Sequence, residues 1–230
     1  MFLGDLAYPA LEGRADVVYL LPLGATEPHG PHAPLTTDTL ISLGICRRAA
    51  ESLRGEVDVL VLPPVPYGVT RYAADFPGAI GVSEETLGAV IRDLAVQVER
   101  LVLVNSHFEP EQVETLRATG LPLLDLTRRK NAERLTEEFR TGSCHAGRYE
   151  TSLVLADQPE LVDRDRMQTL DAKIVEMPAA IAEGRTDFLA MGMDHAYCGS
   201  PAEANAEEGE ETFETLAAML ADLIREVAKG

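Results

Sequence analysis

The chain has 230 residues, of which 46% are hydrophobic and 25% are charged. These values are typical of one globular domain with a sizeable core, and they exclude a largely disordered chain. Acidic residues outnumber basic ones by 38 to 20, which gives a formal net charge of −18. We expect no nucleic-acid partner and no membrane partner, because both would call for basic surfaces.

Three features of the sequence predict a cytoplasmic protein. No apolar stretch is long enough to span a bilayer, and the first residues lack the pattern of a signal peptide. Cys46, Cys144 and Cys198 are odd in number and widely spaced. They form neither a disulfide framework nor a CxxC metal pair, as expected in a reducing compartment.

Short apolar runs alternate with longer amphipathic stretches along the chain. Continuous apolar runs predict buried strands at residues 17–24, 58–68, 101–107 and 121–126. Helical spacing predicts a helix at 37–53, and Ser83 can cap a second one because Glu84 and Glu85 follow in its first turn. This alternation predicts a single α/β domain over residues 1–230, with a mostly parallel sheet flanked by helices.

The C-terminal part of the chain predicts a long amphipathic helix. Ser200, Pro201 and Glu203 fit the N-cap, N1 and N3 positions of a capping box. Apolar residues then recur at helical spacing: Phe213, Leu216, Leu220, Leu223, Ile224 and Val227. Between residues 127 and 200 we expect further helices, with one irregular stretch at 191–199.

Polar residues gather where two of the predicted strands end. Glu27 and His29 follow the first strand, Asp38 lies near the start of the next helix, and His107 and Glu109 follow the strand at 101–107. Ligands bind at the carboxyl ends of strands in open parallel sheets. Imidazole and carboxylate are the ligands of zinc, manganese or iron. Five such groups suffice for two metal ions if one carboxylate bridges them.

The spacing within each pair supports one site. Glu27 and His29 are two residues apart, as are His107 and Glu109, so each pair points to one side of an extended chain. The alternative interpretation is that these residues are loop polar groups, and that Asp38 caps a helix.

A third polar segment spans residues 144–152. His145 precedes small residues, and Glu150 precedes an apolar run. A histidine beside a metal-bound water is suited to carry protons. Glu150 is a candidate to orient His145 or to support the ligands from behind, with helix N-terminal charge pairing as the alternative.

These segments resemble the creatininase family of creatinine amidohydrolase-like proteins. The family pattern Gly-x-x-Glu-x-His-Gly-Pro-His-x-Pro, closing on an Asp, is matched by residues 24–38 without a gap. The Tyr-Gly and Phe-Pro-Gly loop is matched at 66–78, Asn-x-His-x-Glu at 105–109, and His-Ala-Gly-x-x-Glu-Thr-Ser at 145–152. The family's C-terminal helix opening resembles GSPAEANAEEGE. The resemblance covers nearly the whole chain.

The resemblance implies a three-layer sandwich fold and a dinuclear metal centre. One ion would be bound by Glu27, Asp38 and His107, and the other by His29, Asp38 and Glu109, with Asp38 as the bridge. His145 matches the catalytic histidine. The resemblance also implies zinc or manganese as the metal, with iron as an alternative, and a cytoplasmic homo-oligomer, often a hexamer.

The implied reaction is hydrolysis of a C–N bond in a small cyclic or linear amide, other than a peptide bond. Creatinine-cleaving members have tryptophans in the pocket and a glutamate before the catalytic histidine, whereas this chain has no tryptophan and has Cys144 there. We therefore expect a substrate other than creatinine. The alternatives are a metallopeptidase or deformylase acting in cofactor maturation, or a catalytically silent, metal-stabilised binding protein. Arg71, Tyr72 and Arg148 are candidates for substrate contacts or ordinary surface residues.

Overall fold

Four parallel strands form the centre of the fold in the computed structural model, which describes residues 1–230. They lie in the order β2-β1-β3-β4, and their bounds are Val59–Val61 (β2), Val18–Leu23 (β1), Leu101–Asn105 (β3) and Leu123–Leu124 (β4). All three pairings are parallel, which confirms the predicted sheet. β2 is shorter than predicted because Pro63 and Pro64, which follow it, carry no N–H to donate to a ladder.

Helices connect the strands and form the C-terminal half. The α-helices are α1 (Thr37–Ser52), α2 (Glu84–Ala95), α3 (Pro110–Ala118), α4 (Arg129–Ala132), α5 (Glu137–Thr141), α6 (Arg148–Asp157), α7 (Arg164–Gln168), α8 (Met177–Ala182) and α9 (Ala206–Lys229). Short 3₁₀ turns lie at Leu3–Asp5, Tyr8–Leu11, Pro159–Leu161 and Pro201–Glu203. None of the helices is both long and apolar enough to cross a lipid bilayer.

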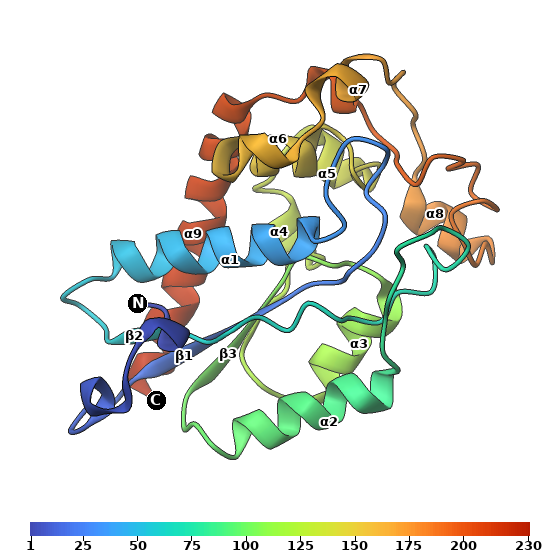
Figure 1. Cartoon of the computed structure of the whole chain (residues 1–230). Coiled ribbons are helices and arrows are strands. Elements are labelled where there is room, and N and C mark those ends of the chain that lie inside the picture. Colours follow the sequence, from blue (N-terminus) through green and yellow to red (C-terminus); the bar gives the residue numbers. More distant parts are fainter.

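The sheet is buried on both faces, which gives three layers (Figure 1). Val18 and Leu20 of β1 pack in the larger core cluster, together with residues of α1, α6 and α9. Leu21 and Leu23 pack in the cluster on the other face, with residues of α2 and α3. This burial explains why the strands read as continuous apolar runs.

The long C-terminal helix starts later than the sequence pattern predicts. Its cap is Asn205, whose side-chain oxygen accepts a hydrogen bond from the backbone N–H of Glu208. Ser200 makes no side-chain cap bond, and Pro201–Glu203 forms a separate 3₁₀ turn. The prediction of a capping box was wrong because Ala204 is extended and separates that turn from α9.

The helix packs as its pattern predicts. Phe213, Leu216, Leu220 and Ile224 are fully buried. Gly209 allows α9 to approach α6 closely, since a Cβ there would lie 2.0 Å from the carbonyl oxygen of Ser152. Residues 191–199 lie outside the helices and strands, as expected. They contribute to a small third core cluster beside the carboxyl end of the sheet.

Candidate metal centre

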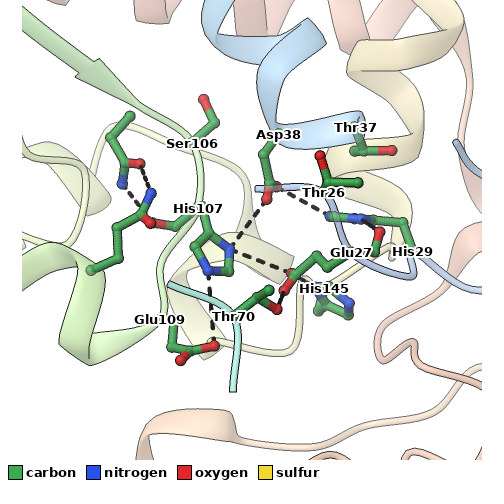
Figure 2. Close-up of polar contacts among 12 residues, drawn as sticks. Thr26, Glu27, His29, Thr37, Asp38, Thr70, Ser106, His107, Glu109 and His145 are labelled. Atoms are coloured by element: carbon green, nitrogen blue, oxygen red, sulfur yellow. Dashed lines mark hydrogen bonds and ion pairs between the residues drawn. The ribbon is translucent and has the colours of Figure 1, made fainter. Parts of the chain in front are cut away.

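The polar segments that follow β1 and β3 start side by side. The two strands are neighbours, and Leu23 is paired with Asn105 at their carboxyl ends. Glu27 follows β1 and His107 follows β3, while Asp38 reaches them from the first turn of α1 (Figure 2). The sheet register therefore delivers residues that are about eighty positions apart in sequence to one place.

Three of these residues form a first group of potential metal ligands. The Nδ1 atom of His107 lies 3.2 Å from Asp38 Oδ2 and 3.4 Å from Glu27 Oε1. One donor atom from each residue lies within 4.8 Å of the others, and all three side chains are buried. This is the set that the sequence resemblance implies for the first ion.

A second group shares Asp38 with the first. The Nε2 atom of His29 lies 3.1 Å from Asp38 Oδ1 and 3.6 Å from Glu150 Oε2. These three residues also have donor atoms within 4.8 Å of one another. Because Asp38 presents one oxygen to each group, it is placed as a bridging carboxylate would be.

Glu150, and not Glu109, therefore lies beside His29. Both carboxylate oxygens of Glu109 accept hydrogen bonds from the backbone N–H of Arg71 at 2.9 Å, and one also accepts from Tyr72. Its nearest approach to a ring nitrogen of the site is 3.9 Å, to His107 Nε2. The grouping of side chains thus differs from the second ligand set that the resemblance implies, since the backbone of residues 71–72 holds Glu109 away from His29.

Each histidine of the site has one ring nitrogen fixed by a backbone carbonyl. His29 Nδ1 donates to Glu27, His107 Nε2 to Val69, and His145 Nε2 to Pro28, at 3.0, 2.7 and 3.0 Å. A carbonyl can only accept, so these nitrogens carry the protons. The other nitrogen of each ring faces the carboxylates, with His145 Nδ1 lying 3.8 Å from Glu27 Oε1.

This arrangement fits divalent metal ions. In a neutral ring, the nitrogen that faces the carboxylates carries a lone pair, so a cation is needed between the two acceptors. One oxygen of Asp38, Oδ2, is buried without a hydrogen-bond partner. Imidazole with two carboxylates is a set that zinc and manganese accept.

Without such ions, protons provide the compensation. Burial would lower the pKa of His29, but the charge of Asp38 raises it to about 10. Burial raises the pKa of Glu150 to about 8 against the opposing charge of His29, and that of Glu109 to about 7 against His107. Burial and the charge of His29 lower the pKa of His145 to about 4, so this ring is neutral at pH 7. Metal binding would therefore release protons from the site.

A buried amide network lies behind His107, and sequence analysis missed it. Gln112, in α3, accepts a hydrogen bond from the backbone N–H of Val69 at 2.8 Å and donates to Asn105 at 2.7 Å. Asn105 in turn donates to the carbonyl of His107. Since His107 donates to the carbonyl of Val69, the network fixes both the ring and its acceptor. A Gln near the start of a helix does not indicate in sequence that its side chain bonds to two distant segments.

A second unpredicted residue holds the segment that carries His145. The carboxylate of Glu138, in α5, accepts from the backbone N–H of Tyr149 at 2.8 Å and of Ser200 at 2.7 Å. A Cβ on Gly147 or Gly199 would lie within about 2.5 Å of this carboxylate. Glu138 thus ties the start of α6 to the loop before α9.

A cavity of about 250 Å³ opens beside the two groups. Its lining includes Glu27, Asp38, Tyr72, His107, Phe108, Glu109, Phe139, Arg140, Cys144, His145, Glu150, Met177, Ile181 and Phe188. Of the three residues singled out beside the motifs, Tyr72 lines the cavity. Arg71 instead pairs with Glu84, and Arg148 pairs with Glu203 and Glu208.

Known proteins resemble this chain over nearly its whole length. The sequence model of the creatininase family, described as creatinine amidohydrolase, matches residues 4–224. A mycofactocin precursor peptide peptidase of Mycobacterium ulcerans is 32% identical over 225 residues, which cover 91% of this chain and 84% of that protein. The creatinine amidohydrolase of Pseudomonas putida is 28% identical over 267 aligned positions, which cover 98% of this chain and 96% of that protein.

Solved structures show the same similarity. A mutant creatininase complexed with creatine has a TM-score of 0.75 at 26% identity, covering 100% of this chain and 99% of that one. Creatininases described as Zn–Zn type and as Mn have TM-scores of 0.74 and 0.73, each at 27% identity and covering 98% of this chain and 97% of the other.

The chain therefore belongs to the creatininase family. At the level of that family it is an amidohydrolase, that is, a hydrolase of C–N bonds, with a single creatininase-like α/β fold. The narrower expectation of a bond other than a peptide bond finds no support in the mycobacterial relative, which is named a peptidase.

Proposed function

We propose that the chain is a two-metal hydrolase that cleaves an amide bond in a peptide. The observation that carries the proposal is the pair of buried carboxylate–imidazole groups that share Asp38 and border a cavity. The similarity to a peptidase favours a peptide over a cyclic amide. The cytoplasmic location and the homo-oligomeric state that the resemblance implies are part of the same proposal.

The proposed ligands are Glu27, Asp38 and His107 for one ion, and His29, Asp38 and Glu150 for the other. What divalent ions would supply at this site is Lewis acidity towards an amide carbonyl and an activated water. Zinc and manganese are the proposed metals, in keeping with the relatives described as Zn–Zn type and as Mn.

His145 is the proposed carrier of the proton. Its Nε2–H is engaged by the carbonyl of Pro28, so Nδ1 is the atom that can accept a proton from the attacking water and pass it to the departing nitrogen. Its low pKa keeps Nδ1 free to accept at neutral pH. Glu109 borders the same cavity with a pKa of about 7, which suits a second acid–base group there.

The test combines metal analysis with an activity screen. Protein purified without chelator should contain about two zinc or manganese ions per chain and should hydrolyse short peptides. Chelation should remove activity, and the metal should restore it. Creatinine, hydantoins and formamides complete the screen, and hydrolysis of one of these with no peptide cleaved would replace the peptide by a small amide as substrate.

Replacement of His145 separates chemistry from metal binding. His145→Ala should lower the turnover number by a factor on the order of 10² to 10⁴ and leave the metal content unchanged. His195→Ala is the matched control, because His195 is exposed and does not line the cavity. Full activity of His145→Ala would refute the proposed proton transfer. Purified protein that contains no metal and whose activity is unchanged by chelators would refute the two-metal site.

A further inference from the structure

The cavity beside the metal centre has walls of two kinds. The carboxylates and histidines of the centre form one part. Apolar side chains form another: Phe108, Phe139, Met177, Ile181 and Phe188. Met177 and Ile181 are four residues apart in α8 and so lie on the same face of the helix. Both are only partly buried, which leaves apolar surface available to a ligand.

The aromatic part of the wall is held in place by contacts within the protein. Phe139 packs edge-on against Phe108, with ring centroids 5.4 Å apart, and it also contacts Tyr149 at 4.8 Å. Phe188 lies against the ring of His145, with centroids 4.5 Å apart. An apolar group bound here would therefore lie close to the proposed proton carrier and would meet a preformed surface.

Arg140 is the only lysine or arginine among the residues that line this cavity. It is exposed at the end of α5, and its guanidinium makes no ion pair or hydrogen bond with any side chain of the protein. In contrast, four other arginines near the site motifs in sequence are all paired with carboxylates: Arg71, Arg117, Arg128 and Arg148. An unpaired guanidinium beside an apolar pocket is suited to form a bidentate pair with a carboxylate.

The surroundings of Arg140 favour an anionic ligand as well. Residues 127–140 contain five basic and three acidic side chains, in a chain whose formal net charge is −18. Among the basic ones, Lys130 and Arg134 are exposed, form no ion pair and line a separate surface hollow. Thr127 and Ala132, from the same segment, line the cavity. The segment is thus weakly positive in an otherwise acidic protein, which favours a negatively charged group near Arg140.

We propose that this cavity is a subsite for the carboxy-terminal residue of a peptide, with the terminal carboxylate on Arg140 and a large apolar side chain against Phe108, Phe139 and α8. The inference rests on the proposed function for the identity of the reaction. Hydrolysis adds the hydroxyl of water to the carbonyl carbon and a proton to the departing nitrogen. The carboxy-terminal fragment therefore leaves with a new amino group and its original carboxylate.

Binding of small probes to the zinc-loaded protein tests the subsite without requiring turnover. N-acetyl-L-phenylalanine should bind at least about tenfold more tightly than N-acetyl-L-phenylalaninamide, because the amide cannot form a charged pair with Arg140. N-acetyl-L-serine should bind about tenfold more weakly than the phenylalanine derivative, since it buries no large apolar side chain. Isothermal titration calorimetry measures all three.

Two arginine variants test whether Arg140 causes the preference for the acid over the amide. Arg140→Met should abolish the difference between acid and amide while retaining the preference for phenylalanine over serine. Arg92→Met is the matched control, because Arg92 is exposed on α2, forms no ion pair and lies outside the cavity lining. It should bind all three probes as the wild type does. Equal binding of acid and amide by the wild type, an unchanged preference in Arg140→Met, or no binding of any probe would each overturn the subsite.

The outcome is separable from that of the proposed function. Carboxylate-dependent binding with no peptide hydrolysed would support the subsite and refute the peptidase. Hydrolysis of free-acid and amidated peptides at equal kcat/KM would support the peptidase and overturn the subsite.

Discussion

The two halves of the candidate metal centre are built in different ways. Glu27, Asp38 and His107 come from the ends of paired strands and the first turn of α1, so the register of the sheet and the start of a helix place them. Glu150 lies in the first turn of α6, and His145 lies just before the helix, next to Ala146, which has a φ of 50°. We call these the strand half and the helix half.

The helix half depends on polar contacts between distant segments. Glu150 accepts a hydrogen bond from the backbone N–H of Ala146 at 2.7 Å, which stabilises a conformation that is uncommon for residues other than glycine. Glu138 fixes the same segment from α5. The strand half is therefore secured by regular structure, whereas the helix half relies on a few individual carboxylates.

The largest expected effects concern Glu150 and Glu109, the two candidate ligands of the second ion. Glu150→Gln should reduce the metal content from about two ions per chain to about one. Glu109→Gln should retain both ions and lower the turnover number by on the order of 10²-fold or more, because it removes an acid–base group. Elemental analysis and steady-state kinetics on the same preparations measure both.

Each glutamine variant is the control for the other, since both replace a buried carboxylate by an isosteric amide. Loss of metal from Glu109→Gln with full occupancy in Glu150→Gln would reverse the assignment. The second ligand would then be the one that the sequence resemblance implies.

An intermediate effect is expected from the network behind the strand half. Gln112→Leu removes the acceptor for Val69 and the donor to Asn105, and so loosens the carbonyl that orients His107. Residues behind metal ligands typically contribute about 10- to 100-fold in affinity, and we expect a loss in that range. Competition with a chromophoric chelator measures the affinity.

Gln97→Leu serves as the control for this change, because Gln97 is exposed and makes no contact with the site. Thermal unfolding of the metal-free proteins shows whether the fold itself has been weakened. Wild-type affinity in Gln112→Leu would mean that the strand ends alone orient His107.

The smallest effect concerns a polar strand end that binds no metal. Asp125 follows β4, and its carboxylate accepts hydrogen bonds from Thr127, Arg117 and Arg128. Burial would raise the pKa of Asp125, but these donors outweigh burial and lower it below the ordinary 3.8. Because the folded protein holds this proton less tightly than the unfolded chain, Asp125 stabilises the fold above about pH 4 and loses that contribution as the pH falls further.

Asp125→Asn should therefore destabilise the protein at pH 7 by about 1.5–3 kcal/mol, the range for hydrogen bonds to a charged group. The difference from wild type should shrink towards zero below pH 4. Urea unfolding across this pH range measures both quantities. A difference that stays constant with pH would show that the charge of Asp125 contributes nothing.

Much of the fold follows from patterns in the sequence. Continuous apolar runs predicted the four strands, and their alternation with helical stretches predicted the parallel sheet. Ser83 caps α2 as expected, accepting from the N–H of Thr86. The start of α9 was misplaced, because a 3₁₀ turn at Pro201 satisfies the same local signals as a helix. Local capping rules cannot distinguish a single turn from a long helix.

The sequence by itself determined which side chains gather at the candidate site. The spacing of Glu27, His29 and Asp38, and of His107 in its own segment, indicated metal ligands at strand ends, and these side chains do converge. Such residues lie next to regular elements, so short-range periodicity is sufficient to place them.

Only the tertiary structure decided which of the candidate side chains lie together. Glu109 is next to His107 in sequence, but the backbone of residues 71–72 holds it, whereas Glu150 comes from a distant helix to face His29. The roles of Gln112, Glu138 and Arg140 were equally absent from the sequence pattern. Each of them depends on contacts, or on an absence of contacts, across segments far apart in the chain, and no local periodicity records such relations.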